Sequence, residues 1–191
     1  MISLGFLPLS INKSVLFKTI FPPPKTILIL KAYQIMEKFL ETLQKAEKTI
    51  QDADHIVYVT FPLIKDKRLL LKVLQETKNA MILCINSILQ YEYLYKRIRI
   101  YSEASDNFRT FTEKCAPRYK ITPEEIKLLL ELFDLAESHK TSPFEFVKNG
   151  KIVILSNGLK PKTLTLESMK EFLILAKSIL KKAGENLRLN F

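Results

Sequence analysis

The chain has 191 residues, of which 47% are hydrophobic and 26% are charged, and it contains 4 glycines and 2 cysteines. This is enough apolar material for one domain with a sizeable core, and it excludes a disordered tail, a collagen-like chain and a disulfide-stapled mini-protein. Thirty Lys and Arg against 20 Asp and Glu give a net charge of +10, so some solvated surface carries excess positive charge.

Residues 1–35 differ from the rest of the chain. They contain lysines but no acidic residue, include the triplet Pro22-Pro23-Pro24, and show neither a sustained helical period nor strict alternation. No apolar run reaches the roughly 18 residues that a bilayer crossing needs, so no membrane insertion is expected. We expect residues 1–35 to be an atypical, poorly packed leader or an over-extended start before Met36, and residues 36–191 to be a single helical-bundle domain.

The first predicted helix covers residues 37–60. Its apolar residues recur at steps of three and four, which places them on one face. These residues are Phe39, Leu40, Leu43, Ala46, Ile50, Ala53 and Val57. Pro62 is expected to end or bend this helix.

A long helix is predicted over residues 66–101, a stretch without proline or glycine. Its middle, residues 80–89, is apolar around nearly the whole circumference, apart from a narrow polar strip marked by Asn79, Asn86 and Gln90. A helix of this kind has to be surrounded, so we expect it at the centre of a bundle.

Two further helices are expected in the next stretch. A short one covers residues 105–116 and is closed by Pro117. Thr122-Pro123-Glu124-Glu125 has the form of a capping box with proline in the first turn, and it predicts a helix to about Ser138. Its expected buried residues are Ile126, Leu129, Leu130, Phe133 and Leu135. Ser142-Pro143-Phe144-Glu145 repeats the capping-box signature, so a second helix start is predicted there, on a short turn.

The C-terminal part predicts a small hairpin and one more helix. Residues 151–155 are β-like, Asn157-Gly158 is a turn signal, and residues 163–165 can return alongside. Thr165 is expected to cap a last helix from Leu166 to about residue 183, with Gly184 just beyond its end. The predicted fold is an all-α bundle of about five helices around one long central helix, with a small β-hairpin before the last helix.

The most distinctive stretch is residues 91–101, in which tyrosines and basic residues are interleaved. Such a pattern suits a single-stranded nucleic acid, because charge holds the backbone and aromatic rings accept stacked bases. The residues expected to form this basic, tyrosine-rich face are Tyr91, Tyr95, Lys96, Arg97, Arg99, Arg109 and Arg118. The alternative is structural: the rings are buried with wet hydroxyls, and the arginines favour the helix end.

Histidine and cysteine offer few other sites. His139 is either a general acid or base with an unseen partner, or a helix-end residue favoured by the dipole. Asp52 and His55 share a helix face, but two ligands are too few for a metal. Cys84 and Cys115 lack paired spacing and are expected to be buried thiols of a cytoplasmic protein. No metal, cofactor or catalytic residue is predicted.

Two stretches resemble an uncharacterised archaeal family of helical proteins: residues 53–63, ADHIVYVTFPL, and residues 142–146, SPFEF. That resemblance implies a helical fold from about Met36 onwards and brings no activity. The long central helix and the basic balance are also similar to the HEPN superfamily of helical bundles, which includes ribonucleases. Its nuclease motif, Arg followed by four to six residues and His, is absent, because no arginine precedes His55 or His139 at that spacing.

Two functional hypotheses follow. The first is a cytoplasmic interaction protein without enzymatic activity that works with a protein partner or as a homodimer and contacts RNA or another nucleic acid through the basic, tyrosine-rich face. The alternative is an HEPN-like RNA-processing enzyme or toxin-antitoxin component that uses His139.

Overall fold

The computed structural model describes residues 24–155 and 161–188, and the side chains of residues 37–155 and 161–186. Helix α2 (Pro24–His55) begins within one compact unit, residues 1–38, and continues into a second, residues 39–191. The expected domain boundary at Met36 stays a prediction.

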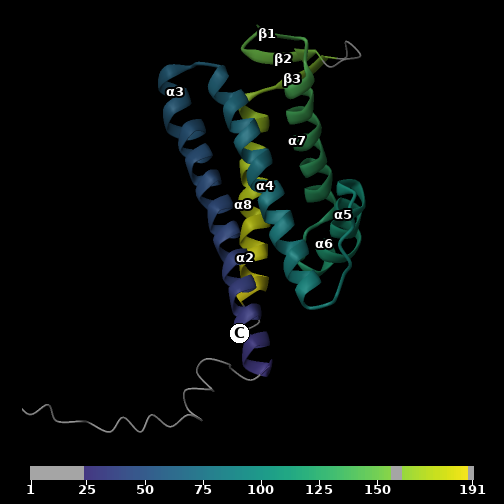
Figure 1. Cartoon of the computed structure of the whole chain (residues 1–191). Coiled ribbons are helices and arrows are strands. Elements are labelled where there is room, and N and C mark those ends of the chain that lie inside the picture. Colours follow the sequence, from purple (N-terminus) through teal and green to yellow (C-terminus); the bar gives the residue numbers. More distant parts are fainter. Residues whose placement is uncertain (1–23, 156–160, 189–191) are drawn as a thin grey trace, which may run out of the picture. The chain divides into compact units, whose positions relative to one another are not determined.

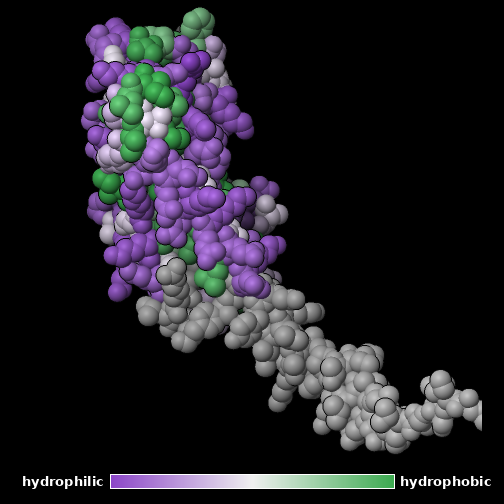
Figure 2. Space-filling model, turned by 90° about the vertical axis from the view of Figure 1, so that its left-hand side faces the viewer, coloured by the Kyte–Doolittle hydropathy of each residue, from purple (hydrophilic) through white to green (hydrophobic). Residues whose placement is uncertain are grey.

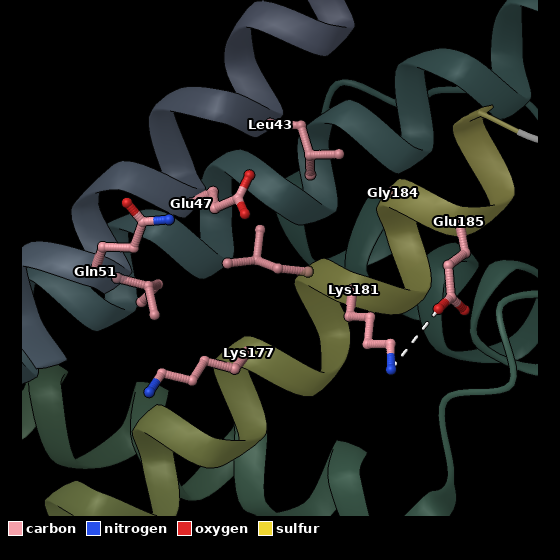
Figure 3. A pocket seen from close by; sticks show the side chains of 9 residues that line it. Leu43, Glu47, Gln51, Lys177, Lys181, Gly184 and Glu185 are labelled. Atoms are coloured by element: carbon pink, nitrogen blue, oxygen red, sulfur yellow. Dashed lines mark ion pairs between the residues drawn. The ribbon is translucent and has the colours of Figure 1, made fainter.

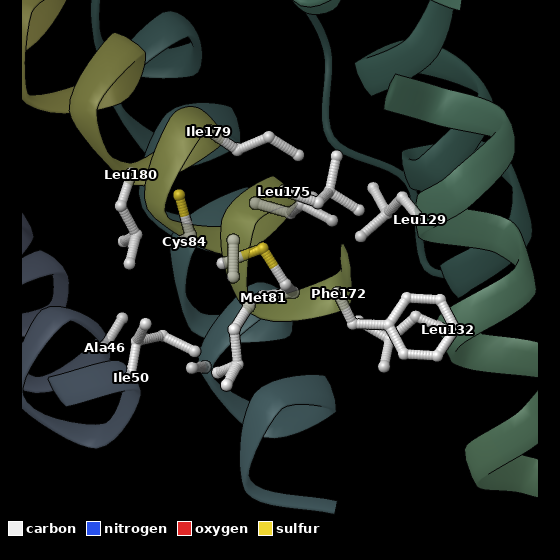
Figure 4. Close-up of a cluster of buried hydrophobic side chains, with 14 of the residues drawn as sticks. Ala46, Ile50, Met81, Cys84, Leu129, Leu132, Phe172, Leu175, Ile179 and Leu180 are labelled. Carbon is white, nitrogen blue, oxygen red and sulfur yellow. The ribbon is translucent and has the colours of Figure 1, made fainter. Parts of the chain in front are cut away.

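Helix α4 (Arg68–Leu94) is the centre of the bundle, as predicted (Figure 1). It contacts α7 (Pro123–Thr141) and α8 (Leu166–Arg188). Met81 and Cys84 lie among side chains of α2, α7 and α8 (Figure 4), and Asn79, Asn86 and Gln90 form the exposed strip. The predicted fold class, an all-α bundle with a small sheet before the last helix, is confirmed.

The predicted apolar face of the first helix is confirmed over most of its length, but its boundaries are wrong. Phe39, Leu43, Ala46, Ile50 and Ala53 are all buried. The helix begins at Pro24, inside the segment for which no helix was predicted. The expected break at Pro62 is wrong too, because helical structure runs on through the π-helix η1 (Ile56–Thr60) and the short α3 (Phe61–Ile64).

Two π-helices explain how prolines enter helical segments. In η1 the N–H of Phe61 donates to the carbonyl of Ile56, and Pro62 follows directly. In η2 (Phe111–Cys115), which continues α5 (Ala104–Thr110), the N–H of Ala116 donates to the carbonyl of Phe111. Pro117 follows inside α6 (Ala116–Arg118) and does not close the helix as predicted. The wider π turn relieves the clash between a proline ring and the carbonyl four residues earlier.

Helix α7 starts at the predicted capping box. The Thr122 hydroxyl accepts a hydrogen bond from the N–H of Glu125, whose carboxylate accepts one from the N–H of Thr122. The helix ends at Thr141, three residues later than predicted. Leu130, expected in the core, is 47% exposed, and Leu132 is fully buried in its place.

The sheet has three antiparallel strands in the order β1-β2-β3, one more than predicted. They are β1 (Phe144–Lys148), β2 (Lys151–Leu155) and β3 (Pro161–Leu164). Asn149 and Gly150, both with positive φ, join β1 to β2 in a two-residue turn. The helix start expected at Ser142 is therefore wrong. The β2–β3 pairing is confirmed, while its predicted turn at Asn157-Gly158 lies outside the described residues.

A polar network fastens the inner face of the sheet to the end of α7. Glu145 and Lys162 both lie opposite Ile154, on neighbouring strands. The Glu145 carboxylate lies 2.5 Å from Nδ1 of His139, and Lys162 Nζ lies 2.7 Å from the Ser138 hydroxyl. These contacts tie β1 and β3 to one end of the bundle.

Helix α8 begins where predicted, with the Thr165 hydroxyl accepting a hydrogen bond from the N–H of Ser168. It continues to Arg188, so Gly184 lies inside the helix and is not its C-terminal cap. A Cβ added at Gly184 would lie 4.0 Å from Cδ2 of Leu43, which is an ordinary van der Waals contact.

Replacing Gly184 by alanine distinguishes a position inside α8 from the predicted position just beyond the helix end. Inside a helix, Gly184→Ala should raise the free energy of unfolding by about 0.5–1 kcal/mol, because alanine has the higher helix propensity. Urea denaturation measures this change. A drop in stability would indicate a left-handed cap at Gly184 and contradict the helix boundary.

Candidate nucleic-acid interface

Helix α4 ends in a turn that folds the chain back over its own last residues. Lys96 adopts a left-handed conformation, its N–H donates to the carbonyl of Tyr93, and the N–H of Arg97 donates to the carbonyl of Glu92. This pair of bonds is the Schellman pattern that closes many helices. It places Arg97 next to the final turn of α4, where Glu92 lies.

The end of α6 repeats the same turn. Lys120 is left-handed, its N–H donates to the carbonyl of Pro117, and the N–H of Ile121 donates to the carbonyl of Ala116. The residues just before it, Arg118 and Tyr119, are thereby held against α4. Two similar turns thus bring side chains from α4 and α6 to one place.

Glu92 is the focus of this arrangement. Its side chain is only 1% exposed, and it accepts hydrogen bonds from Arg97, Arg118 and Tyr119. Arg97 Nη1 lies 3.3 Å and the Tyr119 hydroxyl 3.1 Å from Oε1, while Arg118 binds Oε2. A buried carboxylate is tolerated only with such partners, because it has lost its hydration. Burial also raises the pKa of Tyr119 well above its usual range, so the phenol stays protonated and donates.

Two neighbouring pockets share Arg97. The inner pocket, of about 450 Å³, is lined by Glu92, Arg97, Arg118, Tyr119 and Asn186. The outer pocket, of about 330 Å³, is lined by Lys96, Arg97, Ile98, Arg99, Tyr101 and Lys114. No acidic side chain lines the outer pocket, and the single acid of the inner one is bound by both of its arginines. The pair of pockets is therefore strongly electropositive.

Aromatic rings lie beside these cations. The guanidinium carbon of Arg97 lies 5.0 Å from the ring centroid of Tyr95, which is itself exposed. Tyr101 lines the outer pocket, and its backbone N–H and carbonyl both bond to the Asn107 side chain, at 2.8 Å each. These two hydrogen bonds to one side-chain amide fix the backbone of Tyr101, whose ring is exposed.

The predicted site residues are brought together only in part. Lys96, Arg97, Arg99 and Arg118 line the two pockets, whereas Arg109 pairs with Asp106 at 3.0 Å and lines neither. Tyr95 contacts Arg97.

The prediction that Tyr91 belongs to the basic, tyrosine-rich face is wrong. It is 1% exposed and packs its ring 4.7 Å from that of Tyr95 and 6.4 Å from that of Phe39. Tyr91 therefore belongs to the core, and its ring is not available to a base. The structural alternative is confirmed for the ring, but its wet hydroxyl is wrong for Tyr91, whose hydroxyl is buried as well.

Sequence reasoning missed Glu92, Lys114 and Tyr119. A signal for Glu92 was present, because it continues the buried stripe of α4 through Ile85, Ile88 and Leu89 at helical spacing. An acid on such a stripe predicts a buried ion pair. Nothing local marks Lys114, whose place depends on how η2 packs against α4.

The histidines and cysteines considered as candidate sites lie outside the two pockets. His139 binds Glu145 at the sheet end of α7, away from the two pockets (Figure 1). Cys84 and Cys115 are free and buried, as predicted, and burial raises their pKa to about 12 and about 11. Among the described residues, no cluster of three His, Cys, Asp or Glu side chains could hold a metal, and His55 with Asp52 forms no such group.

A third cavity, of about 440 Å³, lies between α2 and α8 (Figure 3). Leu43, Ile50 and Leu180 contribute apolar walls, and its charged residues have both signs, including Lys181 and Glu185, whose charged atoms lie 4.0 Å apart. This balance makes it unlike the two basic pockets, and it does not favour a polyanion.

Comparison with known proteins returned no matching family model, no matching curated protein and no matching solved structure. Across residues 24–155 and 161–188, no helix has both the length and the apolar character needed to cross a bilayer.

The role of Glu92 is tested by comparing two charge-neutralising variants. Glu92→Gln should lower the free energy of unfolding by about 1–3 kcal/mol, because two guanidinium groups lose their buried partner. Asp106→Asn, which breaks the exposed pair with Arg109, should change it by about 0.5 kcal/mol or less. Urea denaturation compares the two, and equal effects would contradict the structural importance of Glu92.

Proposed function

We propose that this protein binds single-stranded RNA, with the sugar-phosphate backbone held along the inner and outer pockets. The observation that carries the proposal is the outer pocket, which is lined by Lys96, Arg97, Arg99 and Lys114 and by no acidic side chain. Lysine and arginine clusters bind phosphates mainly by releasing counterions, whatever the sequence of the strand.

The rings beside these cations favour a single strand over a duplex. Tyr95 is 42% exposed and its ring contacts Arg97. Tyr101 is 44% exposed and lines the outer pocket together with its basic side chains. Exposed rings next to a backbone-binding groove accept unpaired bases of any kind by stacking. The proposed activity is therefore binding with little sequence preference.

The two arginines bound to Glu92 add a fixed element to this surface. A guanidinium has five N–H donors, and Arg97 and Arg118 each donate a hydrogen bond to Glu92 through Nη1. The remaining donors suit a phosphate, for which arginine has the matching fork geometry. Glu92 is a positioning residue in this account, since it orients the arginines and does not touch the strand.

Two further parts of the proposal concern the setting of the protein. The buried free thiols of Cys84 and Cys115 support a reducing compartment such as the cytoplasm. A homodimer or another protein partner stays a prediction, and so does the HEPN-like RNA-processing alternative through His139.

The proposal is tested by the salt dependence of RNA binding. Fluorescence anisotropy with a labelled single-stranded RNA should give an affinity that falls steeply with salt, with a log–log slope of about −0.7 per phosphate contact. Arg99→Gln/Lys114→Gln should weaken binding roughly tenfold and make the slope shallower by about 1.4, since two contacts are lost.

Arg109→Gln is the matched control. It removes an exposed arginine from the neighbouring helix that lines neither pocket, so it should leave affinity and slope nearly unchanged. An equal loss in the control would indicate a diffuse charge effect and contradict a defined site. Absence of salt-sensitive binding in the unmodified protein would overturn the proposal.

A further inference from the structure

The corner formed by η1 and α3 exposes an unusual amount of apolar surface. Leu63 is 80% exposed, Ile64 is 62% exposed, and Val59 is also exposed, while Phe61 turns inwards and is buried. Figure 2 shows hydrophobic surface gathered towards the upper end of the face on which this corner lies, above a largely hydrophilic middle. None of the three pockets described above is lined by these side chains. The high exposure of Leu63 and Ile64 indicates that these side chains project from the corner.

A second exposed apolar group lies on β1. Among the strands that the structure describes, β1 pairs with β2 alone, so its other edge is open to them. Phe144 is 69% exposed, and Phe146 and Val147 are exposed as well. Native proteins usually protect such an edge, and apolar residues on it mark a contact surface.

The corner and the strand lie at the same end of the bundle (Figure 1). Helix α8 starts directly after β3, and Lys170 in its second turn has Nζ 5.3 Å from the ring centroid of Tyr58 in η1. The η1–α3 corner therefore lies beside the beginning of α8, next to the point where the sheet joins it.

Basic side chains follow both apolar groups directly in the sequence. Lys65 comes after Ile64 and is followed by Lys67 and Arg68, with Asp66 bound to Arg68. The β1–β2 turn carries an exposed lysine on each side, Lys148 and Lys151. Apolar tips bordered by lysine suit an anionic lipid surface, where the tips enter the interface and the ammonium groups meet the headgroups.

We propose that this end of the bundle docks on the surface of an anionic lipid bilayer, without crossing it. The lipid-facing residues are Leu63, Ile64, Phe144 and Phe146, and the headgroup-facing residues are Lys65, Lys148 and Lys151; Phe144, Phe146 and Lys148 share one face of β1. A protein partner is the less favoured occupant, because protein interfaces are depleted in lysine.

This proposal does not depend on the RNA site, which lies at the other end of α8. Asn186 of the inner pocket is 16 residues from Lys170, which corresponds to about 24 Å along the helix. The two surfaces can therefore be inactivated separately.

Flotation of the full chain with vesicles tests the proposal. The protein should float with phosphatidylcholine vesicles that contain phosphatidylglycerol, less with phosphatidylcholine alone, and less at high salt. Leu63→Ser/Ile64→Ser should reduce binding to the anionic vesicles roughly tenfold or more, because two apolar side chains no longer enter the interface. Leu130→Ser, a change of an exposed leucine on α7, should have no effect.

RNA binding in the same variants shows that they are folded and separates the two surfaces. Leu63→Ser/Ile64→Ser should keep the affinity for RNA, and Arg99→Gln/Lys114→Gln should keep most of the binding to vesicles. Failure of the unmodified chain to float with anionic vesicles would overturn the proposal, as would unchanged flotation of Leu63→Ser/Ile64→Ser. Loss of self-association in that variant without loss of flotation would assign the corner to a protein contact and would also overturn it.

Discussion

The structure depends on the burial of α4, which leaves only a narrow strip of its circumference in contact with water. That burial has a chemical consequence at the last turn, because the inward-facing stripe ends in an acid, Glu92. A carboxylate in that position requires cations and donors within reach. Arg97, Arg118 and Tyr119 supply them, and the ion pairs join the end of the central helix to α6.

The same interaction connects packing to the proposed function. Two arginines that are held by a buried carboxylate keep their charge and lose much of their freedom to move, so less conformational entropy is lost when they bind a phosphate. Lys96, Arg99 and Lys114 extend this positive surface into the outer pocket. The opposite end of the bundle has a different chemistry, with apolar tips and flanking lysines.

The parts predictable from sequence are those determined by periodicity and by local hydrogen bonds, such as the surrounded α4 and the capping box at Thr122. Ser142-Pro143 has the same signature as Thr122-Pro123 but precedes a strand, because β1 pairs with β2 across the Asn149-Gly150 turn. Pairing of that kind is not encoded in the four residues themselves. The basic cluster around Arg97 was recognisable from its composition. The sequence did not show which residues belong to this cluster, because the burial of Tyr91 and the position of Lys114 depend on tertiary packing.

If RNA binds as proposed, the arginines held by Glu92 contact its phosphates. NMR signals of the guanidinium N–H groups test it most directly, because arginines in a buried ion pair rotate slowly enough to be followed individually. On addition of single-stranded RNA, the signals of Arg97 and Arg118 should shift, and those of Arg109 should stay in place. Unchanged Arg97 and Arg118 signals in the presence of bound RNA, or equal shifts for Arg109, would contradict this account.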